Sequence, residues 1–131
     1  MGADDSRALP KTQGFLAEGA RIPSVRMGAL EGRPSPGRVD LKPLLVGEEM
    51  LMVEITEDAG VRVPEHSHDD HESLVYLVKG RVRLWIDGKE FVAHAGDAWI
   101  HPKGVRHWSE TLEPCVMVEI KSPPRKTWQS A

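Results

Sequence analysis

Short apolar stretches separated by turn signals fill the chain after Pro43, and this rhythm restricts the possible folds more than any other feature. The stretches recur about every ten residues, a spacing typical of all-β sandwiches and barrels rather than of helical proteins. Glycine, proline and acidic residues stand between them. The sequence therefore predicts a compact antiparallel barrel with strands at residues 48–55, 73–80, 81–86, 89–95, 97–102 and 114–120.

Residues 81–95 predict a β-hairpin whose two faces can be assigned. Val82, Leu84 and Ile86 recur at every second position, the period of a strand with one buried face. The opposite face of the strand holds Arg81, Arg83 and Trp85, and the two arginines are expected to face solvent. Asp87-Gly88 follows, a pair that tolerates the positive φ angles of a two-residue hairpin turn.

Length and charge exclude several classes of protein. A chain of 131 residues is expected to form one domain with a real interior. The net charge of −3 is spread over both signs, which argues against nucleic-acid and membrane partners. The acidic start and the lack of a long apolar run predict a cytoplasmic protein. Cys115, the single cysteine, is expected to be a small buried residue.

Changes in composition predict three segments. Residues 1–42 are rich in glycine and proline, including "EGRPSPGR", and we expect a partly ordered N-terminal arm there. The barrel is expected to occupy residues 43–124. Residues 125–131 are expected to form a C-terminal tail.

The stretch "PEHSHDDHES" at residues 64–73 concentrates three of the six histidines of the chain. His66 and His68 are two positions apart, so on a strand both imidazoles would point to the same side. This spacing alone is weak evidence for a metal site, because such pairs also occur in exposed loops. Its context adds weight: Gly60 precedes the pair, and Glu72 and Gly80 follow it.

A second stretch, "GDAWIHPKGVRH", completes a pattern that resembles the cupin superfamily. Gly96, Pro102, Gly104 and His107 follow one another with five, one and two residues between them, and 15 residues separate Gly80 from Gly96. The short gap is similar to that of small single-domain bacterial cupins of the conserved-barrel type. The phrases "YLVKG" and "VEIKSPPR" also resemble cupins that ketonise unsaturated uronates. The resemblance implies an all-β double-stranded β-helix, a jelly-roll barrel with its site inside the mouth.

Carried over by position, the resemblance implies His66, His68 and His107 as ligands of one divalent transition metal ion, Zn, Mn, Ni or Fe. The fourth ligand is open, because the loop after His68 is one residue longer than the uronate-type pattern. Glu72 is favoured, since a carboxylate is a better ligand than a hydroxyl. The alternatives are Ser73 and His71, which would lie on the opposite face of a strand.

Further residues are candidates for chemistry around the metal. Glu72 and His101 are the candidate acid or base residues. Ser73, Tyr76 and Arg106 are the candidate residues of a substrate pocket. At Thr111, where the family usually has asparagine, the hydroxyl can still bond to the backbone at the strand end.

The implied metal ligands predict an enzyme of the isomerase, ketonising or lyase type. Its substrate is expected to be a small oxygenated molecule such as a sugar acid or keto acid. An Fe(II) dioxygenase acting on a diketone-like substrate is one alternative. A non-catalytic barrel that binds a metal or a small ligand is another, because one fold hosts many functions. The resemblance also implies a homodimer, in which the glycine- and proline-rich arm could cover a sheet edge or reach a second subunit.

Overall fold

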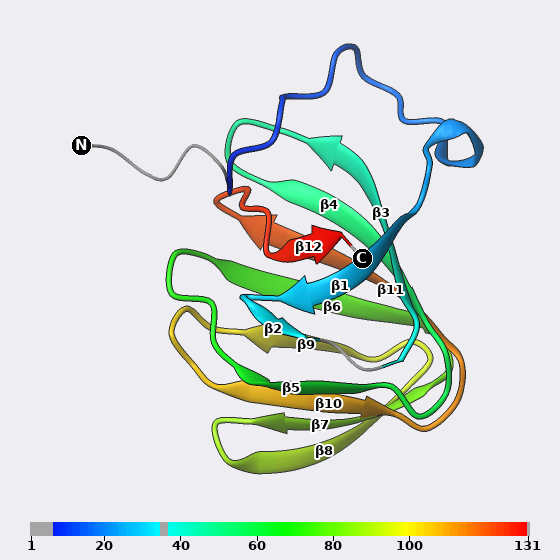
Figure 1. Cartoon of the computed structure of the whole chain (residues 1–131), viewed down its shortest axis with the longest axis vertical. Coiled ribbons are helices and arrows are strands. Elements are labelled where there is room, and N and C mark those ends of the chain that lie inside the picture. Colours follow the sequence, from blue (N-terminus) through cyan, green and yellow to red (C-terminus); the bar gives the residue numbers. More distant parts are fainter. Residues whose placement is uncertain (1–6, 35–36, 131) are drawn as a thin grey trace.

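Antiparallel β-strands make up nearly all of the regular structure in the computed structural model (Figure 1), which describes residues 7–34 and 37–130. One short 3-10 turn, η2 (Gly19–Arg21), precedes the strands. The strands are β1 (Val25–Leu30), β2 (Arg33–Pro34), β3 (Val39–Val46), β4 (Leu51–Glu57), β5 (Arg62–His66), β6 (Glu72–Lys79), β7 (Arg81–Ile86), β8 (Lys89–His94), β9 (Ala98–His101), β10 (His107–Thr111), β11 (Cys115–Ser122) and β12 (Trp128–Ser130). Among the described residues, no helix is long and apolar enough to span a membrane.

Two antiparallel sheets face each other across the interior (Figure 1). The larger has the order β12-β1-β3-β4-β11-β6-β9, with β2 paired to β1. The smaller has the order β5-β10-β7-β8. Strands distant in sequence are neighbours in both sheets, as a jelly roll requires, and the all-β prediction is confirmed.

The β7–β8 hairpin forms as predicted from its sequence. Ile86 pairs with Lys89 across the turn, and the two turn residues, Asp87 and Gly88, have φ angles of 52° and 74°. Val82 and Leu84 are buried, whereas Arg81 is exposed. The period-two pattern of this strand therefore identified its inner face correctly.

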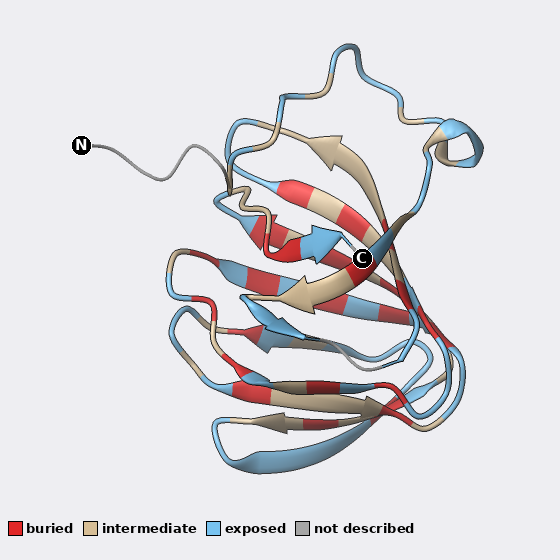
Figure 2. Cartoon of the chain, viewed as in Figure 1, coloured by how far each residue is buried: buried red, intermediate tan, exposed pale blue. Residues whose placement is uncertain are grey.

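Two apolar clusters join the sheets. One combines residues of the larger sheet with Val63 of β5 and Val61 just before it. The residues of the larger sheet are Met27, Val39, Leu41, Leu51, Val53 and Trp128. The other joins β6 and β11 to the β7–β8 hairpin through Val75, Leu77, Cys115, Met117, Val82, Leu84 and Ala93. Leu77 is fully buried, so Leu77→Ala is expected to destabilise the fold by about 2–5 kcal/mol. Figure 2 shows the burial alternating along β6.

The expected segment boundaries differ from the positions of the strands. β1 lies wholly within residues 1–42 and β3 begins there, and both pair in the larger sheet. β12 falls within the expected tail and pairs with β1. Glycine and proline interrupt these strands but leave enough apolar residues, such as Met27 and Val39, to be buried. Residues 1–6, 35–36 and 131 of the expected arm and tail lie outside the described residues.

Two residues of the sequence motifs have structural roles. Gly80 has a φ of 100°, and a Cβ there would lie 2.5 Å from the carbonyl oxygen of Pro114. Only glycine fits this turn between β6 and β7 without displacing the backbone. Thr111 accepts a hydrogen bond from the amide of Val61 and donates one to the carbonyl oxygen of Asp58. The predicted bonding of Thr111 to the backbone at the strand end is thus confirmed.

Candidate metal centre and cavity

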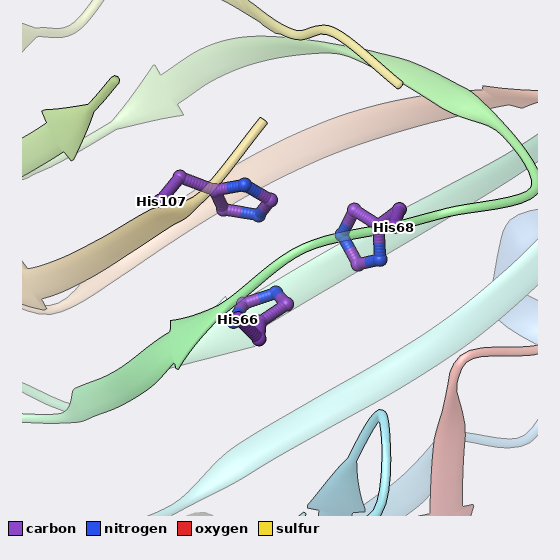
Figure 3. A group of neighbouring side chains, drawn as sticks. All are labelled: His66, His68 and His107. Atoms are coloured by element: carbon purple, nitrogen blue, oxygen red, sulfur yellow. The ribbon is translucent and has the colours of Figure 1, made fainter. Parts of the chain in front are cut away.

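Three histidines meet where β5 and β10 pair (Figure 3). His66 ends β5, His107 begins β10, and the two are direct cross-strand partners. Such partners have Cβ atoms about 5 Å apart, so their side chains meet on one face. His68 lies in the loop beyond β5, where its carbonyl oxygen accepts a hydrogen bond from the amide of Gly104 at 2.9 Å. That bond ties the two motif loops together.

One ring nitrogen of each triad histidine converges with the other two. Each histidine offers one nitrogen, and these nitrogens lie within 4.8 Å of one another. Nδ1 of His66 faces the carbonyl oxygen of Pro64 at 2.7 Å, and Nδ1 of His107 faces that of Val105 at 3.1 Å. Both Nδ1 atoms can donate to these carbonyls, which leaves each Nε2 lone pair directed inward.

Nε2 of His66, Nε2 of His107 and Nδ1 of His68 are buried without a hydrogen-bond partner among the described residues. Burial lowers the pKa of His66 below its ordinary value, and it lowers the pKa values of His68 and His107 to about 2. Neutral imidazoles are the form that binds metals. Two buried, unpaired Nε2 atoms, those of His66 and His107, and a nitrogen of His68 that converges with them fit a transition-metal ion.

A second polar group lies directly beside the triad, on β9, β6 and β11, and the ligand atoms of two of its members, His101 and Glu119, lie within 4.8 Å of one another and of a nitrogen of His68. The His101 ring stacks on His107 with centroids 3.7 Å apart and planes 5° from parallel. Trp99 donates its indole N–H to Nε2 of His101 at 3.2 Å, so Nδ1 of His101 carries the hydrogen. That nitrogen lies 3.0 Å from Ser73 Oγ and 3.6 Å from a carboxylate oxygen of Glu119. His101 is thereby fixed in orientation and directed at Glu119.

Glu119 and Lys121 form a buried pair on the inner face of β11. Lys121 Nζ lies 3.7 Å from Glu119 Oε1 and also donates to the hydroxyl of Thr127. Burial alone would raise the pKa of Glu119, but Lys121 and His101 outweigh it and hold that pKa well below its ordinary value. Burial lowers the pKa of Lys121. The cavity therefore contains an ionised carboxylate next to the histidine triad.

The cavity itself has a volume of about 80 Å³. Its histidine end is polar, and its other end is mainly apolar, with Ile55, Val75, Val82, Leu84 and Met117 among the residues that line it. Glu57, at the end of β4, also lines this space. Burial raises the pKa of Glu57 to about 7, and the charge of Glu119 adds to the effect.

Strand parity separates the candidates for a fourth ligand. Glu72 is exposed on the outer face of β6, whereas Ser73 is buried and faces inward. The structure therefore does not bring the favoured Glu72 to the histidines, because adjacent positions of a strand face opposite sides. His71 is buried with its ring centroid 4.5 Å from that of His68, and its Nδ1 bonds to Asp70.

Of the three residues predicted to line a substrate pocket, one faces the interior and two lie at the surface. Ser73 reaches the polar group through its hydrogen bond to His101. Tyr76 lies on the outer face of β6 and is half exposed. Arg106 is exposed and pairs with Glu65 at 3.0 Å, so its charge is balanced at the surface. Of the three, only Ser73 belongs to the site.

Sequence reasoning missed Glu57, Glu119 and Lys121. In the segment "CVMVEIKS" the alternation places Glu119 and Lys121 on the same face as Cys115. Cys115 is predicted to be buried, and the same alternation then places both charged residues inside the barrel. For Glu57 a weaker signal existed, since it shares a face with Leu51 and Val53.

Comparison with known proteins supports the fold. The model of the cupin domain family matches residues 52–121, more than half of the chain. This chain belongs to the cupin family. It is 28% identical over 79 residues to the pectin degradation protein KdgF of Dickeya dadantii (strain 3937), a match that covers 60% of this chain and 72% of the relative.

Solved structures show the same fold. KdgF from Halomonas sp. superposes with a TM-score of 0.64 at 26% identity, over 67% of this chain and 82% of that one. An RmlC-like cupin from Shewanella frigidimarina NCIMB 400 superposes with a TM-score of 0.74 at 22% identity, over 87% and 95% of the two chains. The expected cupin jelly roll is therefore confirmed, and the protein is similar to the KdgF cupins.

Proposed function

We propose that this cupin is a metal-dependent enzyme that shifts a proton within a small oxygenated substrate, a sugar acid or keto acid, in an isomerising or ketonising reaction. The observation that carries the proposal is the adjacency of two groups in one cavity. One nitrogen of each of His66, His68 and His107 converges there, and Nε2 of His66 and of His107 is buried without a partner among the described residues. The ionised carboxylate of Glu119 stands beside them, next to His101. A purely structural barrel has no need of either.

Each residue of this arrangement has a separate task. His66, His68 and His107 would hold one divalent ion, Zn, Mn, Ni or Fe, which as a Lewis acid supplies stabilisation of an enolate-like charge. Glu119 accepts a proton from one position of the substrate and returns it to the neighbouring position, so no proton is gained or lost overall.

Two neighbours prepare Glu119 for this task. His101 directs its Nδ1–H towards the carboxylate, and Ser73 and Trp99 hold the His101 ring in that orientation. Lys121 keeps Glu119 ionised and adds a positive charge to the cavity wall. A substrate carboxylate at the histidine end of the cavity would lie near the positive charge of Lys121.

The likeness to two KdgF proteins supports the choice of substrate class. One of them is described as a pectin degradation protein, and pectin is a polymer of sugar acids. The match to the cupin family model spans residues 52–121 and so includes the strands that hold the histidine triad. An unsaturated uronate is therefore the first substrate to test.

The test measures metal and turnover on the same preparation. Protein purified without chelator is expected to contain metal or to take up about one equivalent on titration. The loaded protein is expected to abolish the ultraviolet absorbance of an unsaturated uronate. Less than about a tenth of an equivalent of metal, with no uptake, would contradict the metal centre.

Two further results would favour the other classes of function. Oxygen consumption by the Fe(II)-loaded protein with a panel of diketones, without uronate turnover, would indicate a dioxygenase. Metal uptake without turnover of either substrate class would indicate a binding barrel. Glu119→Gln, compared at equal metal content, should lose uronate turnover, and its metal affinity is measured as well because Glu119 lies within 4.8 Å of the ligand atoms of His68 and His101.

We also propose that a second copy of the chain covers the outer face of the larger sheet. Leu74, Tyr76, Val78 and Ile100 are between 44% and 51% exposed there. Leu74 pairs in register with Ile100 on β9 and with Ile120 on β11, so the apolar side chains form a continuous patch. Patches of this kind mark interaction surfaces. Light scattering is expected to show a dimer.

A further inference from the structure

Glu57 is an unexplained charge-bearing residue at the apolar end of the cavity. It ends β4, where Cys115 of β11 and Val39 of β3 are its cross-strand partners. Both partners are fully buried. The side chain of Glu57 is 6% exposed and lines the same cavity as the histidine triad. The residue therefore sits inside the barrel, away from the polar group that surrounds Glu119.

One oxygen of this carboxyl group has no partner in the described part of the chain. Its Oε1 is buried without a hydrogen-bond partner, and none of the ion pairs among the described residues includes Glu57. A buried polar atom without a partner destabilises a fold, and a buried carboxylate without a cation does so more. The neighbouring inward positions of β4, Leu51 and Val53, are apolar and fully packed.

An apolar residue at position 57 would therefore suit the fold better than glutamate. Methionine has a similar length and would leave no polar atom without a partner, so the fold itself gives no reason for a carboxyl group. The cavity has room for several water molecules, or for a ligand fragment of a few carbon atoms. An unpaired acceptor aimed into such a space suits a ligand that brings a donor.

We propose that Glu57 is a second anchoring point for the ligand, accepting a hydrogen bond from a hydroxyl or amino group at the end remote from the histidine triad. Glu57 lies opposite Cys115, four residues along β11 from Glu119, and both carboxyl groups line the same cavity. The inference rests on the proposed function for the ligand class: a polyhydroxylated acid whose oxygenated head meets the histidines. Its distal hydroxyl then meets Glu57, while its carbon chain contacts Leu84 and Met117.

The experiment compares binding, turnover and stability in the full-length, metal-loaded protein. Glu57→Met and Glu57→Leu remove the acceptor, and Glu54→Gln on the outward side of β4 is the matched control. Calorimetry measures the binding of galacturonate, a stable polyhydroxylated acid. The unsaturated uronate measures KM and kcat, and thermal unfolding measures Tm.

Removal of the acceptor is expected to weaken galacturonate binding and to raise KM, each about tenfold or more, with a smaller change in kcat. The same variants are expected to have a higher Tm than the wild type, because an unpaired buried carboxyl group has gone. Glu54→Gln is expected to change none of these quantities by more than about twofold. A purely structural role for Glu57 would predict a lower Tm instead.

Unchanged binding and KM in either folded variant would overturn the subsite, as water alone would then satisfy Glu57. Wild-type protein that binds neither acid would also overturn it, since the ligand class would be wrong. Galacturonate binding that depends on Glu57 without uronate turnover would support the subsite and contradict the proposed reaction. The two proposals can therefore fail separately.

Discussion

Strands β7 and β11 have the same alternating period but opposite relations between polarity and burial. In β7, Val82 and Leu84 face the interior and Arg81 faces solvent. In β11, Glu119 and Lys121 face the interior, and the outward positions hold Val116, Val118 and Ile120. β7 follows the usual rule of an apolar inner face. β11 departs from it where the barrel carries its cavity.

The departure has a physical cost that points to function. A buried ion pair gains less from its attraction than it loses in hydration unless its geometry and hydrogen bonds are very good. Apolar residues of similar size at positions 119 and 121 would be neutral or stabilising for the fold. A charged inner face beside an apolar outer face therefore distinguishes the site-bearing strand from the purely structural one.

Removing the inner charge of β11 gives the largest expected effect. Glu119→Gln keeps the shape of the side chain but lowers its basicity, so kcat with the unsaturated uronate should fall by between about a hundredfold and ten-thousandfold. The free energy of unfolding should also fall, by about 3–5 kcal/mol, because Lys121 is left buried without its counter-charge. Steady-state kinetics at equal metal content measures the first quantity. Arg81→Ala on β7 is the control, and a similar loss there would contradict the distinction between the strands.

Removing one histidine of the triad tests the metal site beside Glu119. His107→Ala deletes one of three converging nitrogens, so affinity for Zn, Ni or Mn should fall by about a hundredfold. His94→Ala is the matched control, since that imidazole is exposed at the end of β8. Calorimetric titration measures both. Equal affinities in the two variants would show that the triad does not hold the metal.

The pH dependence of stability separates Glu57 from the histidines. Burial raises the pKa of Glu57 from 4.5 to about 7, so between these values the unfolded state binds fewer protons. Glu57 therefore makes the free energy of unfolding fall by about 3 kcal/mol as the pH rises through this window. The histidines have lowered pKa values and act in the opposite sense, with stability rising as the pH rises.

Glu57→Gln removes only the first contribution. The difference between the wild-type and variant unfolding curves, measured in urea from pH 4 to pH 8 at equal metal content, should thus show the Glu57 slope by itself. A flat difference curve would mean that the carboxyl group is hydrated or paired in the folded protein.

The sequence was sufficient to predict the features that depend on a local pattern or on the spacing of motifs. The hairpin at Asp87-Gly88 and the convergence of His66, His68 and His107 both belong to this class. The choice between Glu72 and Ser73 depended on strand register, and an extra residue in the preceding loop removed the reference point. Glu119 was missed for a different reason, because an inner face that carries a cavity does not obey the polarity rule.

A substitution in the apolar outer face is expected to have the smallest effect on the isolated fold. It tests whether the outward apolar residues of β11 and its neighbours serve association. Ile100→Lys places a charge in the patch formed by β6, β9 and β11, so the dimer dissociation constant should rise by about tenfold or more. The free energy of unfolding of the monomer should change by no more than about 0.5 kcal/mol, because Ile100 is already 44% exposed. Arg81→Ala should leave association unchanged, since its ion pair with Glu113 is at the surface. Light scattering over a range of concentrations measures association. A wild-type protein that stays monomeric at the highest concentration would show that the outward apolar residues of β11 and its neighbours do not form a dimer interface.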